Sequence, residues 1–354
     1  MLSTSQKNQL IQAGIFAPSA DNSQPVQFHW QNDNTLEIWI DEKRSGKASD
    51  NRFILSDIAL GAVIENIIIY AQSLPLTTKI DYFPNGEKEE LLVAIIYFLP
   101  TENSAPKECL VSEIPKRCTD RRFPFKGPIK KQTIELLTNA AKQHDCDLLS
   151  FTCKKAIKRV LPVIQQAETI RFKSKILHQE LFSTVHFNNE QSEEGMPISV
   201  LAIEKPAQPI FKQMKKWPVM NFVNKIGGAT MLGFRSVRMP ILFSPALVLI
   251  TMNGKDRLSI IKAGQAIQRV WLKASQQGLS VQPYAAPGIF SLGYIACEDE
   301  FKSQLKSVSK KMHAIVNSEK STENNYGLMF LRIGYNKPVE HRSNRRTIDS
   351  FAKT

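Results

Sequence analysis

One segment of this sequence occurs twice, and this repeat constrains the fold more than any other feature. Residues 55–76, LSDIALGAVIENIIIYAQSLPL, align without a gap with residues 258–279, LSIIKAGQAIQRVWLKASQQGL. The two copies share seven identical residues, among them Gly61 and Gly264. Both are mostly apolar and predict long helices in which a glycine lets another backbone approach closely, as at the centre of a fold. The repeat therefore predicts two similar units, although two unrelated buried helices can also resemble each other this much.

Strand-like runs flank each copy of this helix, separated by turn signals such as QNDNT and PNGEKEE. We therefore expect an α+β fold in which two pseudo-symmetric units are fused in one chain, with antiparallel-rich sheets packed against helices. The first unit is expected at residues 1–105 and the second at 106–354. The runs are VQFHW (26–30), LEIWID (36–41), TTKIDYF (77–83), LLVAIIYFL (91–99), PALVLITM (245–252), LSVQPYA (279–285) and YGLMFLRIGY (326–335).

The charge of the chain favours an anionic partner. It carries 46 lysines and arginines against 33 acidic residues, a formal net charge of +13, and 42% of its 354 residues are hydrophobic. This is enough apolar material for a large core. The positive balance suits nucleic acid, a phosphate-bearing cofactor or an anionic membrane, and it selects none of them.

Cysteine usage and the N-terminus indicate a reducing compartment. The five cysteines form no C-x-x-C pair and match no zinc pattern, so we expect incidental thiols and no metal site. The first residues, MLSTSQKNQLIQAG, lack the basic and apolar regions of a secretory signal. No uninterrupted apolar run of about 18 residues is present. These features predict a cytoplasmic protein.

The loop APSADNSQPVQF, residues 17–28, offers more hydrogen-bonding groups than a turn requires. Ser19, Asp21, Asn22 and Gln24 lie between two prolines, where a simple turn needs a single Gly, Pro or Asx residue. This density of polar groups predicts a surface that binds a ligand.

A second candidate is the motif RCTDRRF, residues 117–123. Arg117 and Arg121 are four residues apart with Thr119 between them. Guanidinium groups bind phosphate through two parallel hydrogen bonds, and a hydroxyl can complete a small anion cradle. A solvated basic face is the alternative interpretation.

Two further segments could contribute to the same site. The stretch EHRSNRRT (340–347) supplies Arg342, Arg345 and Arg346 after the last strand, although a solvated or nucleic-acid-binding tail would look the same. The stretch VQPYAAPGIF (281–290) predicts either a shaped loop with accessible backbone N–H groups, suited to the edge of a flat aromatic ligand, or a plain turn.

Taken together, these motifs resemble the nitroreductase-like flavoprotein superfamily. The resemblance rests on APSADNSQP, the duplicated helix, RCTDRRF in the form R-x-[ST]-x-R-x-F, PYAAPG, and the final strand followed by arginines. More narrowly, the tandem arrangement resembles the Acg family, in which two such units are fused so that one chain imitates the usual homodimer. A fused pseudo-dimer can act as a monomer, and the sequence leaves further dimerisation open.

The resemblance implies an FMN site between the two units. The polar loop of one unit would reach a flavin held by the other, and only one of the two pseudo-symmetric sites carries both motifs, which implies one FMN per chain. The loop departs from the family pattern at Val26, where an aromatic residue is common. The implied cofactor-binding residues are Pro18, Ser19, Asn22, Gln24, Arg117, Thr119, Arg121, Pro287, Gly288, Arg342 and Arg346.

The resemblance also implies a chemistry. NAD(P)H would donate a hydride to the flavin N5 in a ping-pong reaction, and an unidentified small-molecule acceptor would then take the electrons. No catalytic acid or base can be named. The alternative from another class is a protein that sequesters FMN without turnover. A nucleic-acid-binding protein rests on charge alone, because no recognition motif is present.

One basic, apolar segment is extra to a minimal unit. An insertion is expected at about 205–243, and its residues 211–243 combine lysines and arginines with Trp217, Phe222, Met231 and Phe234. Three interpretations stay open: a lid over the flavin, a peripheral membrane contact, and a helix pair that packs on the core.

Overall fold

Two four-stranded antiparallel sheets form the framework of the protein. The computed structural model describes residues 1–88, 91–101, 110–319 and 325–353. The first sheet has the order β1-β2-β4-β3 and the second β5-β8-β10-β9. The strands of the first sheet are β1 (Val26–Asn32), β2 (Thr35–Ile40), β3 (Leu76–Tyr82) and β4 (Leu92–Pro100). Those of the second are β5 (Cys146–Phe151), β8 (Ala246–Met252), β9 (Leu279–Tyr284) and β10 (Tyr326–Tyr335).

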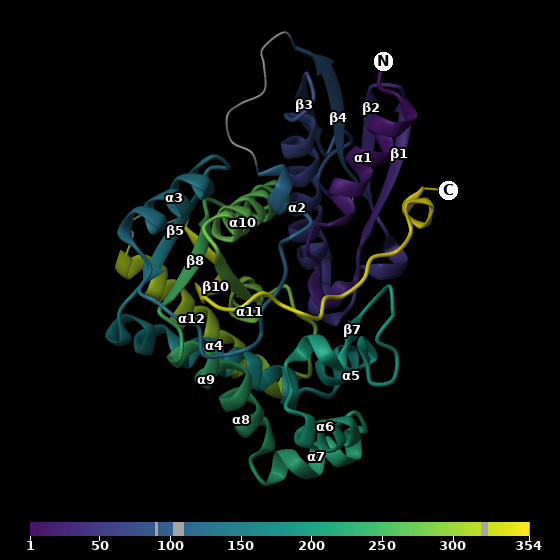
Figure 1. Ribbon diagram of the computed structural model, residues 1–354. Coiled ribbons are helices and arrows are strands. Elements are labelled where there is room, and N and C mark those ends of the chain that lie inside the picture. Colours follow the sequence, from purple (N-terminus) through teal and green to yellow (C-terminus); the bar gives the residue numbers. More distant parts are fainter. Residues whose placement is uncertain (89–90, 102–109, 320–324, 354) are drawn as a thin grey trace.

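The two sheets are built in the same way, which confirms the α+β fold and the pseudo-symmetry expected from the repeat. In each, a helix precedes the first strand, and the central helix connects the second strand to the third. The leading helices are α1 (Thr4–Ile15) and α3 (Lys131–Lys142), and the central helices are α2 (Ile54–Ala71) and α10 (Arg257–Gln276). In Figure 1, α2 and α10 lie beside each other between the two sheets. The expected boundary between residues 105 and 106 lies outside the described residues.

The duplicated helices cross at their shared glycine. A Cβ atom on Gly61 would lie 2.2 Å from the carbonyl oxygen of Ile261, and one on Gly264 would lie 2.3 Å from that of Ile58. Ile58 and Ile261 are themselves equivalent in the repeat, so the contact is reciprocal. Only glycine, which has no Cβ atom, permits the two helix backbones to approach this closely. Although α2 is long and apolar enough for a membrane span, most of its surface is buried in this packing.

A second reciprocal contact lies one turn further along the crossing. Glu65 accepts a hydrogen bond from Arg269, and Gln268 donates one of 2.7 Å to the Asn66 side chain. Glu65 aligns with Gln268 and Asn66 with Arg269 in the repeat. The same pair of positions therefore holds an ion pair on one side of the pseudo-twofold axis and an amide pair on the other.

The central helices are shorter than the repeated segments. They end at Ala71 and Gln276, and the last repeated residues, Leu76 and Leu279, begin strands β3 and β9. Sequence similarity thus continues through the turn into the next strand, because both units make the same helix-to-strand connection.

The second unit carries a long helical segment where the first has only a tight turn. Residues 152–245 connect β5 to β8, whereas two residues connect β1 to β2. The insertion expected at about 205–243 forms the second part of this segment. The whole segment between β5 and β8 contains the helices α4 (Lys154–Lys173), α5 (Lys175–Ser183), α6 (Gln208–Met214), α7 (Trp217–Lys225), α8 (Gly228–Gly233) and α9 (Met239–Leu242).

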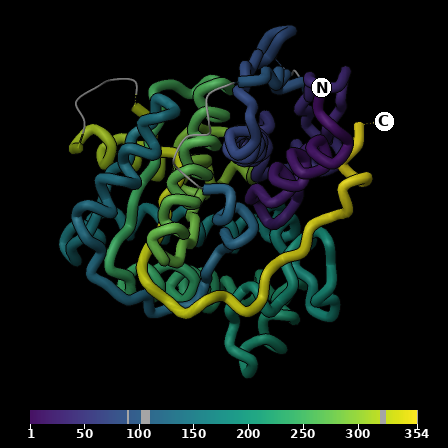
Figure 2. The backbone as a smooth tube through the Cα atoms, turned by 45° about the horizontal axis from the view of Figure 1, so that its top comes forward, coloured from purple at the N-terminus to yellow at the C-terminus, as the bar shows by residue number. Residues whose placement is uncertain are grey.

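The C-terminal segment returns from the second unit to the first. After β10, residues 336–353 run across the molecule and end beside β1 (Figures 1 and 2). There, Lys353 N–H donates to the Phe28 carbonyl, and Ala352 forms an isolated bridge with Phe28. The helices α11 (Ala286–Leu292) and α12 (Lys302–Glu319) precede β10. The end of the second half of the chain therefore completes the structure of the first half.

Candidate functional site

A cavity of about 810 Å³ lies against the crossing of α2 and α10. The first unit contributes the polar loop and α2, and the second contributes α10, the start of α11 and the helical segment between β5 and β8. Most lining side chains are apolar, including Ile58, Ile267 and Trp271 from the crossing itself. A volume of this size is typical of sites for small molecules and cofactors, which are concave, mostly apolar and furnished with a few polar groups.

The first part of the polar loop lines this cavity. Pro18, Ser19 and Asp21 are lining residues. Asp21, Asn22 and Gln24 adopt φ angles of 48°, 59° and 53°, in the left-handed region that side chains rarely occupy. Such strain persists only where surrounding contacts hold it, and it is concentrated at ligand sites.

Asn22 and Gln24 face away from the cavity and hold other segments in place. Asn22 Nδ2 donates to the Gly195 carbonyl at 3.1 Å, and its Oδ1 accepts from Arg345 at 2.7 Å. Gln24 Oε1 accepts from the backbone N–H of Arg346 at 3.0 Å. These two side chains therefore attach the C-terminal segment to the loop, and their hydrogen bonds fix its left-handed conformation.

From the arginine motif, Thr119 and Arg121 line the cavity. Arg121 donates to the Val200 carbonyl at 3.1 Å and lies 3.5 Å from the Met196 sulfur. Among the described residues no carboxylate forms an ion pair with it. Burial lowers the pKa of Arg121, with nearby Asp21 acting in the opposite direction. A desolvated cation of this kind is stabilised by an anionic ligand.

Arg117 lies behind the cavity wall. Its guanidinium carbon is 4.6 Å from the ring centroid of Trp271, which does line the cavity, and its Nη2 donates to the Phe16 carbonyl. Burial, together with the neighbouring Arg345 charge, lowers the pKa of Arg117 to about 9. Its contact with Trp271 supports the wall through a cation–π interaction.

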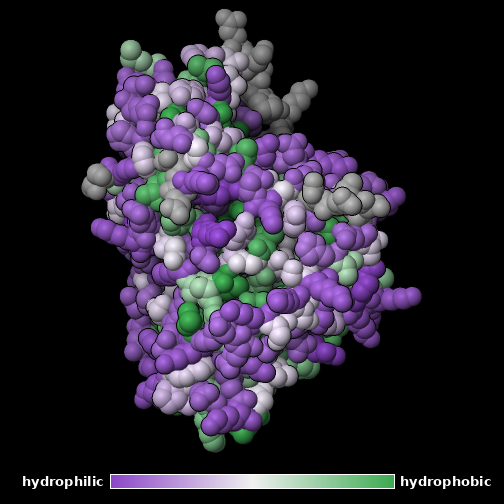
Figure 3. Space-filling view, turned by 180° about the vertical axis from the view of Figure 1, so that it is seen from behind, coloured by the Kyte–Doolittle hydropathy of each residue, from purple (hydrophilic) through white to green (hydrophobic). Residues whose placement is uncertain are grey.

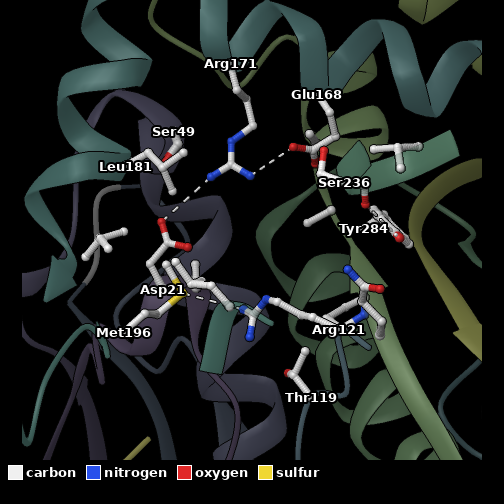
Figure 4. Close-up of a pocket in the computed structure, with 18 of the residues that line it drawn as sticks. Asp21, Ser49, Thr119, Arg121, Glu168, Arg171, Leu181, Met196, Ser236 and Tyr284 are labelled. Carbon is white, nitrogen blue, oxygen red and sulfur yellow. Dashed lines mark hydrogen bonds and ion pairs between the residues drawn. The ribbon is translucent and has the colours of Figure 1, made fainter. Parts of the chain in front are cut away.

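Arg171 and Arg235 also line the cavity, and neither was expected as a site residue from the sequence. Arg171 on α4 points into the same space as Arg121 (Figure 4). It is 3.2 Å from Glu168 and 3.8 Å from Asp21, and these carboxylates outweigh burial and raise its pKa. The only sequence signal was an acidic and a basic residue three apart on a helix, which is common on solvated faces.

The VQPYAAPGIF segment supplies wall residues on both sides of the two predicted ones. Tyr284 and Gln282 line the cavity, whereas Pro287 and Gly288 do not. Gly288 lies in α11, where a Cβ would be 1.8 Å from the Leu328 carbonyl oxygen, so it packs the helix against β10. Gln282 is buried, and its Oε1 has no hydrogen-bond partner among the described residues.

The C-terminal arginines lie outside the cavity. Arg342 donates to the Pro115 carbonyl at 2.8 Å, and Arg346 donates to the Gln24 carbonyl at 3.1 Å. Arg345 donates to the Ile15 and Ala17 carbonyls at the end of α1. Arg345 and Arg346 therefore attach the C-terminal segment to the first unit, whereas Arg342 attaches it to the segment before the arginine motif.

The site can therefore bind a ligand that is partly apolar and partly anionic. Arg121 offers a positive charge with no carboxylate ion pair among the described residues, Ser19 and Thr119 offer hydroxyls, and most of the wall is apolar. The other two lining arginines form ion pairs with lining carboxylates: Arg171 with Asp21 and Glu168, and Arg235 with Glu204. Within the described ranges no group of three or more His, Cys, Asp or Glu side chains is arranged to hold a metal ion.

Comparison with known proteins finds relatives in Mycobacterium tuberculosis, and no family model matches the chain. "Uncharacterized protein MT1398" is 24% identical over 288 residues, which cover 80% of this chain but only 39% of that protein. "Putative NAD(P)H nitroreductase Rv3131" is 23% identical over 281 residues, covering 78% of this chain and 75% of that protein. The second relative confirms the resemblance to nitroreductase-like proteins. The narrower resemblance to the Acg family stays a prediction.

Several solved structures that are partly similar to this chain are named as nitroreductases or nitroreductase-like proteins. The FMN-dependent nitroreductase NfnB from Mycobacterium smegmatis, solved in complex with NADPH, has a TM-score of 0.39 and 12% identity, over 68% of this chain and 96% of that one. A nitroreductase-like family protein from Bacillus cereus has a TM-score of 0.37 and 12% identity, over 71% and 98% of the two chains.

Proposed function

We propose that this protein is a flavoprotein that binds one FMN in the large cavity and acts as an NAD(P)H-dependent oxidoreductase of the nitroreductase type. The observation that carries the proposal is the meeting of Ser19 from the first unit with Thr119 and Arg121 from the second at one cavity. Its relationship to a protein named as an NAD(P)H nitroreductase supports the same activity.

The chemistry of the cavity fits FMN. A flavin phosphate needs cations, and Arg121 has no carboxylate ion pair among the described residues. The ribityl chain needs hydroxyl partners, which Ser19 and Thr119 offer. A flat ring needs apolar walls and a few polar groups, and the unpartnered Oε1 of buried Gln282 is an acceptor next to such a wall.

In this proposal the protein positions the cofactor and shields it. Bound FMN supplies the redox chemistry, taking a hydride from NAD(P)H and passing the electrons to an acceptor. Arg121 and Arg171 stabilise negative charge in the cavity because they are held in place before the reaction. Ile58, Ile267 and Trp271 exclude water from the apolar part.

We expect one FMN per chain because the two halves are equivalent in topology but not in sequence. The loop that carries Ser19 precedes β1 of the first unit, and the motif that carries Thr119 and Arg121 precedes α3 of the second. Neither motif is repeated at the pseudo-symmetric position in the other half.

Replacing Arg121 with glutamine is expected to weaken FMN binding. The loss of a charged hydrogen-bond donor to the phosphate costs about 1.5–3 kcal/mol, or roughly 10- to 100-fold in Kd. The measurement is a titration of FMN followed by its visible absorption and fluorescence. Arg159→Gln is the matched control, because Arg159 is an exposed arginine on α4 that pairs with Glu319. Equal affinities of the two variants would contradict the assignment of Arg121.

Anaerobic reduction of the flavin-loaded protein distinguishes catalytic turnover from sequestration of FMN. If bound FMN loses its absorption on anaerobic addition of NADPH and regains it with an acceptor, the protein is a reductase. If one FMN binds per chain and does not bleach, the alternative of a flavin-sequestering protein takes its place. If no flavin binds, both are wrong.

A further inference from the structure

Helices α6, α7 and α8 carry an apolar surface that no described part of the chain covers. Among the described residues, ten large hydrophobic side chains are exposed, and six of them lie between residues 210 and 243. Their exposed fractions range from 44% to 73%. Five of them lie on or next to α6, α7 and α8: Ile210, Phe222, Ile226, Met231 and Phe234. The sixth, Phe243, follows α9 and stacks on Phe123. Single exposed hydrophobic residues are normal, but such a concentration marks a contact surface.

The same segment is strongly basic and contains no acidic residue. Residues 205–243 hold seven lysines and arginines, more than half of the net charge of +13. Arg235 pairs with Glu204, immediately before the segment. The other six are exposed to solvent: Lys205, Lys212, Lys215, Lys216, Lys225 and Arg238.

The opposite side of these helices packs against α4 and α5, and this packing fixes which side of the helices faces solvent. Met214 and Met220 are buried in a separate apolar cluster with Phe172 and Phe182 from α4 and α5. The helices project at the lower end of the molecule in Figure 1. Figure 3 shows apolar side chains beside hydrophilic ones at this end.

This surface is continuous with the mouth of the cavity. Ile210 and Met231 are exposed and also line the cavity, beside the partly buried lining residues Phe211 and Leu232. A partner bound to the helices would therefore lie next to the opening.

We propose that helices α6–α8 dock this protein on an anionic lipid membrane, with the mouth of the cavity next to the bilayer. Apolar side chains interspersed with lysines are the combination that lies in a membrane interface, where lipid headgroups take the charges and the acyl boundary takes the rings. A second copy of the chain would bring two acid-free basic surfaces together, which electrostatics opposes. Nucleic acid could stack bases on the phenylalanines but would leave the exposed aliphatic side chains, Ile210, Ile226 and Met231, without partners.

Sedimentation with vesicles tests this proposal on the intact chain. Vesicles of pure phosphatidylcholine are compared with vesicles that contain phosphatidylserine. We expect binding to the anionic vesicles, weakened by salt. Lys215→Gln/Lys216→Gln should reduce the affinity by roughly 5-fold per lysine. Phe222→Ser/Ile226→Ser should reduce it on anionic vesicles even at low salt, because the apolar contribution is lost.

Matched variants on other surfaces control for charge and hydrophobicity. Lys306→Gln/Lys310→Gln removes two exposed lysines from α12, and Leu136→Ser/Ile176→Ser removes two exposed apolar side chains from α3 and α5. Both should bind like the parent protein. Equal binding to neutral and anionic vesicles, or equal losses in test and control variants, would overturn the proposal. The proposal would also be overturned if sedimentation velocity showed a dimer of the parent protein that the Phe222→Ser/Ile226→Ser variant does not form. None of these readouts requires bound flavin, so failure here is separable from failure of the proposed activity.

Discussion

Substituting alanine for Gly264 is expected to destabilise the protein by roughly 3 kcal/mol or more, although alanine is the better helix former. The reason is the crossing of α2 and α10, where a Cβ on Gly264 would lie 2.3 Å from the Ile58 carbonyl oxygen. Backbone cannot move aside as a flexible side chain can, so the helices must separate and lose packing on both sides. Urea denaturation followed by circular dichroism measures the free energy of unfolding.

Gly14→Ala is the matched control for this substitution. Gly14 is also helical and buried, but its added Cβ would meet only side-chain carbons of Val63 and Ile67 at 3.2 Å. There the gain in helix propensity, about 1 kcal/mol, should offset the tight contact. Comparable losses for Gly14→Ala and Gly264→Ala would contradict the special role of the crossing. Because the contact is reciprocal, Gly61→Ala should cost a similar amount, and the double variant less than the sum.

The helix crossing also connects the fold to the proposed function. Gly264 lines the large cavity, together with Ile58 and Ile267 from the two central helices. Separating the helices would therefore reshape the wall against which a flavin would lie. In this protein the residues that hold the two units together are also part of the candidate site.

The arrangement of two similar units could be predicted from the sequence because the central helix of each unit has a similar sequence. The similarity of residues 55–76 and 258–279 reflects one helix, one close contact and one helix-to-strand connection made twice. The order of strands within each sheet is not visible in such a pattern, since pairing depends on contacts between distant segments. The helical segment between β5 and β8 begins before the expected insertion at about 205–243, because only its second part stands out in composition.

The candidate site was predictable only in part. Motifs show which residues occur together but not which way each side chain points. In the loop, Ser19 faces the cavity whereas Asn22 and Gln24 hold the C-terminal segment, and all three are polar residues in a sequence of six. Arg171 belongs to no motif, because it reaches the cavity from a helix that has no counterpart in the first unit.

Replacing Glu65 with glutamine is expected to cost about 3–5 kcal/mol at neutral pH, which is typical when one partner of a buried ion pair is removed. Glu65 is completely buried at the crossing of α2 and α10, where Arg269 donates to it and His144 Nε2 lies 2.9 Å from its Oε2. Glutamine keeps the size of the side chain but removes the negative charge that Arg269 and His144 contact. Asn66 and Gln268, at the pseudo-symmetric position, show that a neutral amide pair fits this crossing, so the cost comes from charge and not from shape.

The pH dependence of the unfolding free energy separates the contribution of the Glu65 charge from that of its shape. Burial alone would raise the pKa of Glu65, but His144 and Arg269 outweigh it, and the pKa is held below the ordinary value of 4.5. Because the folded-state pKa is lowered, the carboxylate contributes its full stability above the unfolded pKa and loses it as the pH falls through the folded pKa. The difference in unfolding free energy between the parent protein and Glu65→Gln should therefore be constant near neutrality and shrink below about pH 4.5. Glu135→Gln, which removes an exposed partner of Lys131, should change stability by no more than about 0.5 kcal/mol. A difference between the parent and Glu65→Gln that persists unchanged into acid would show that the carboxylate acts by filling space and not by its charge.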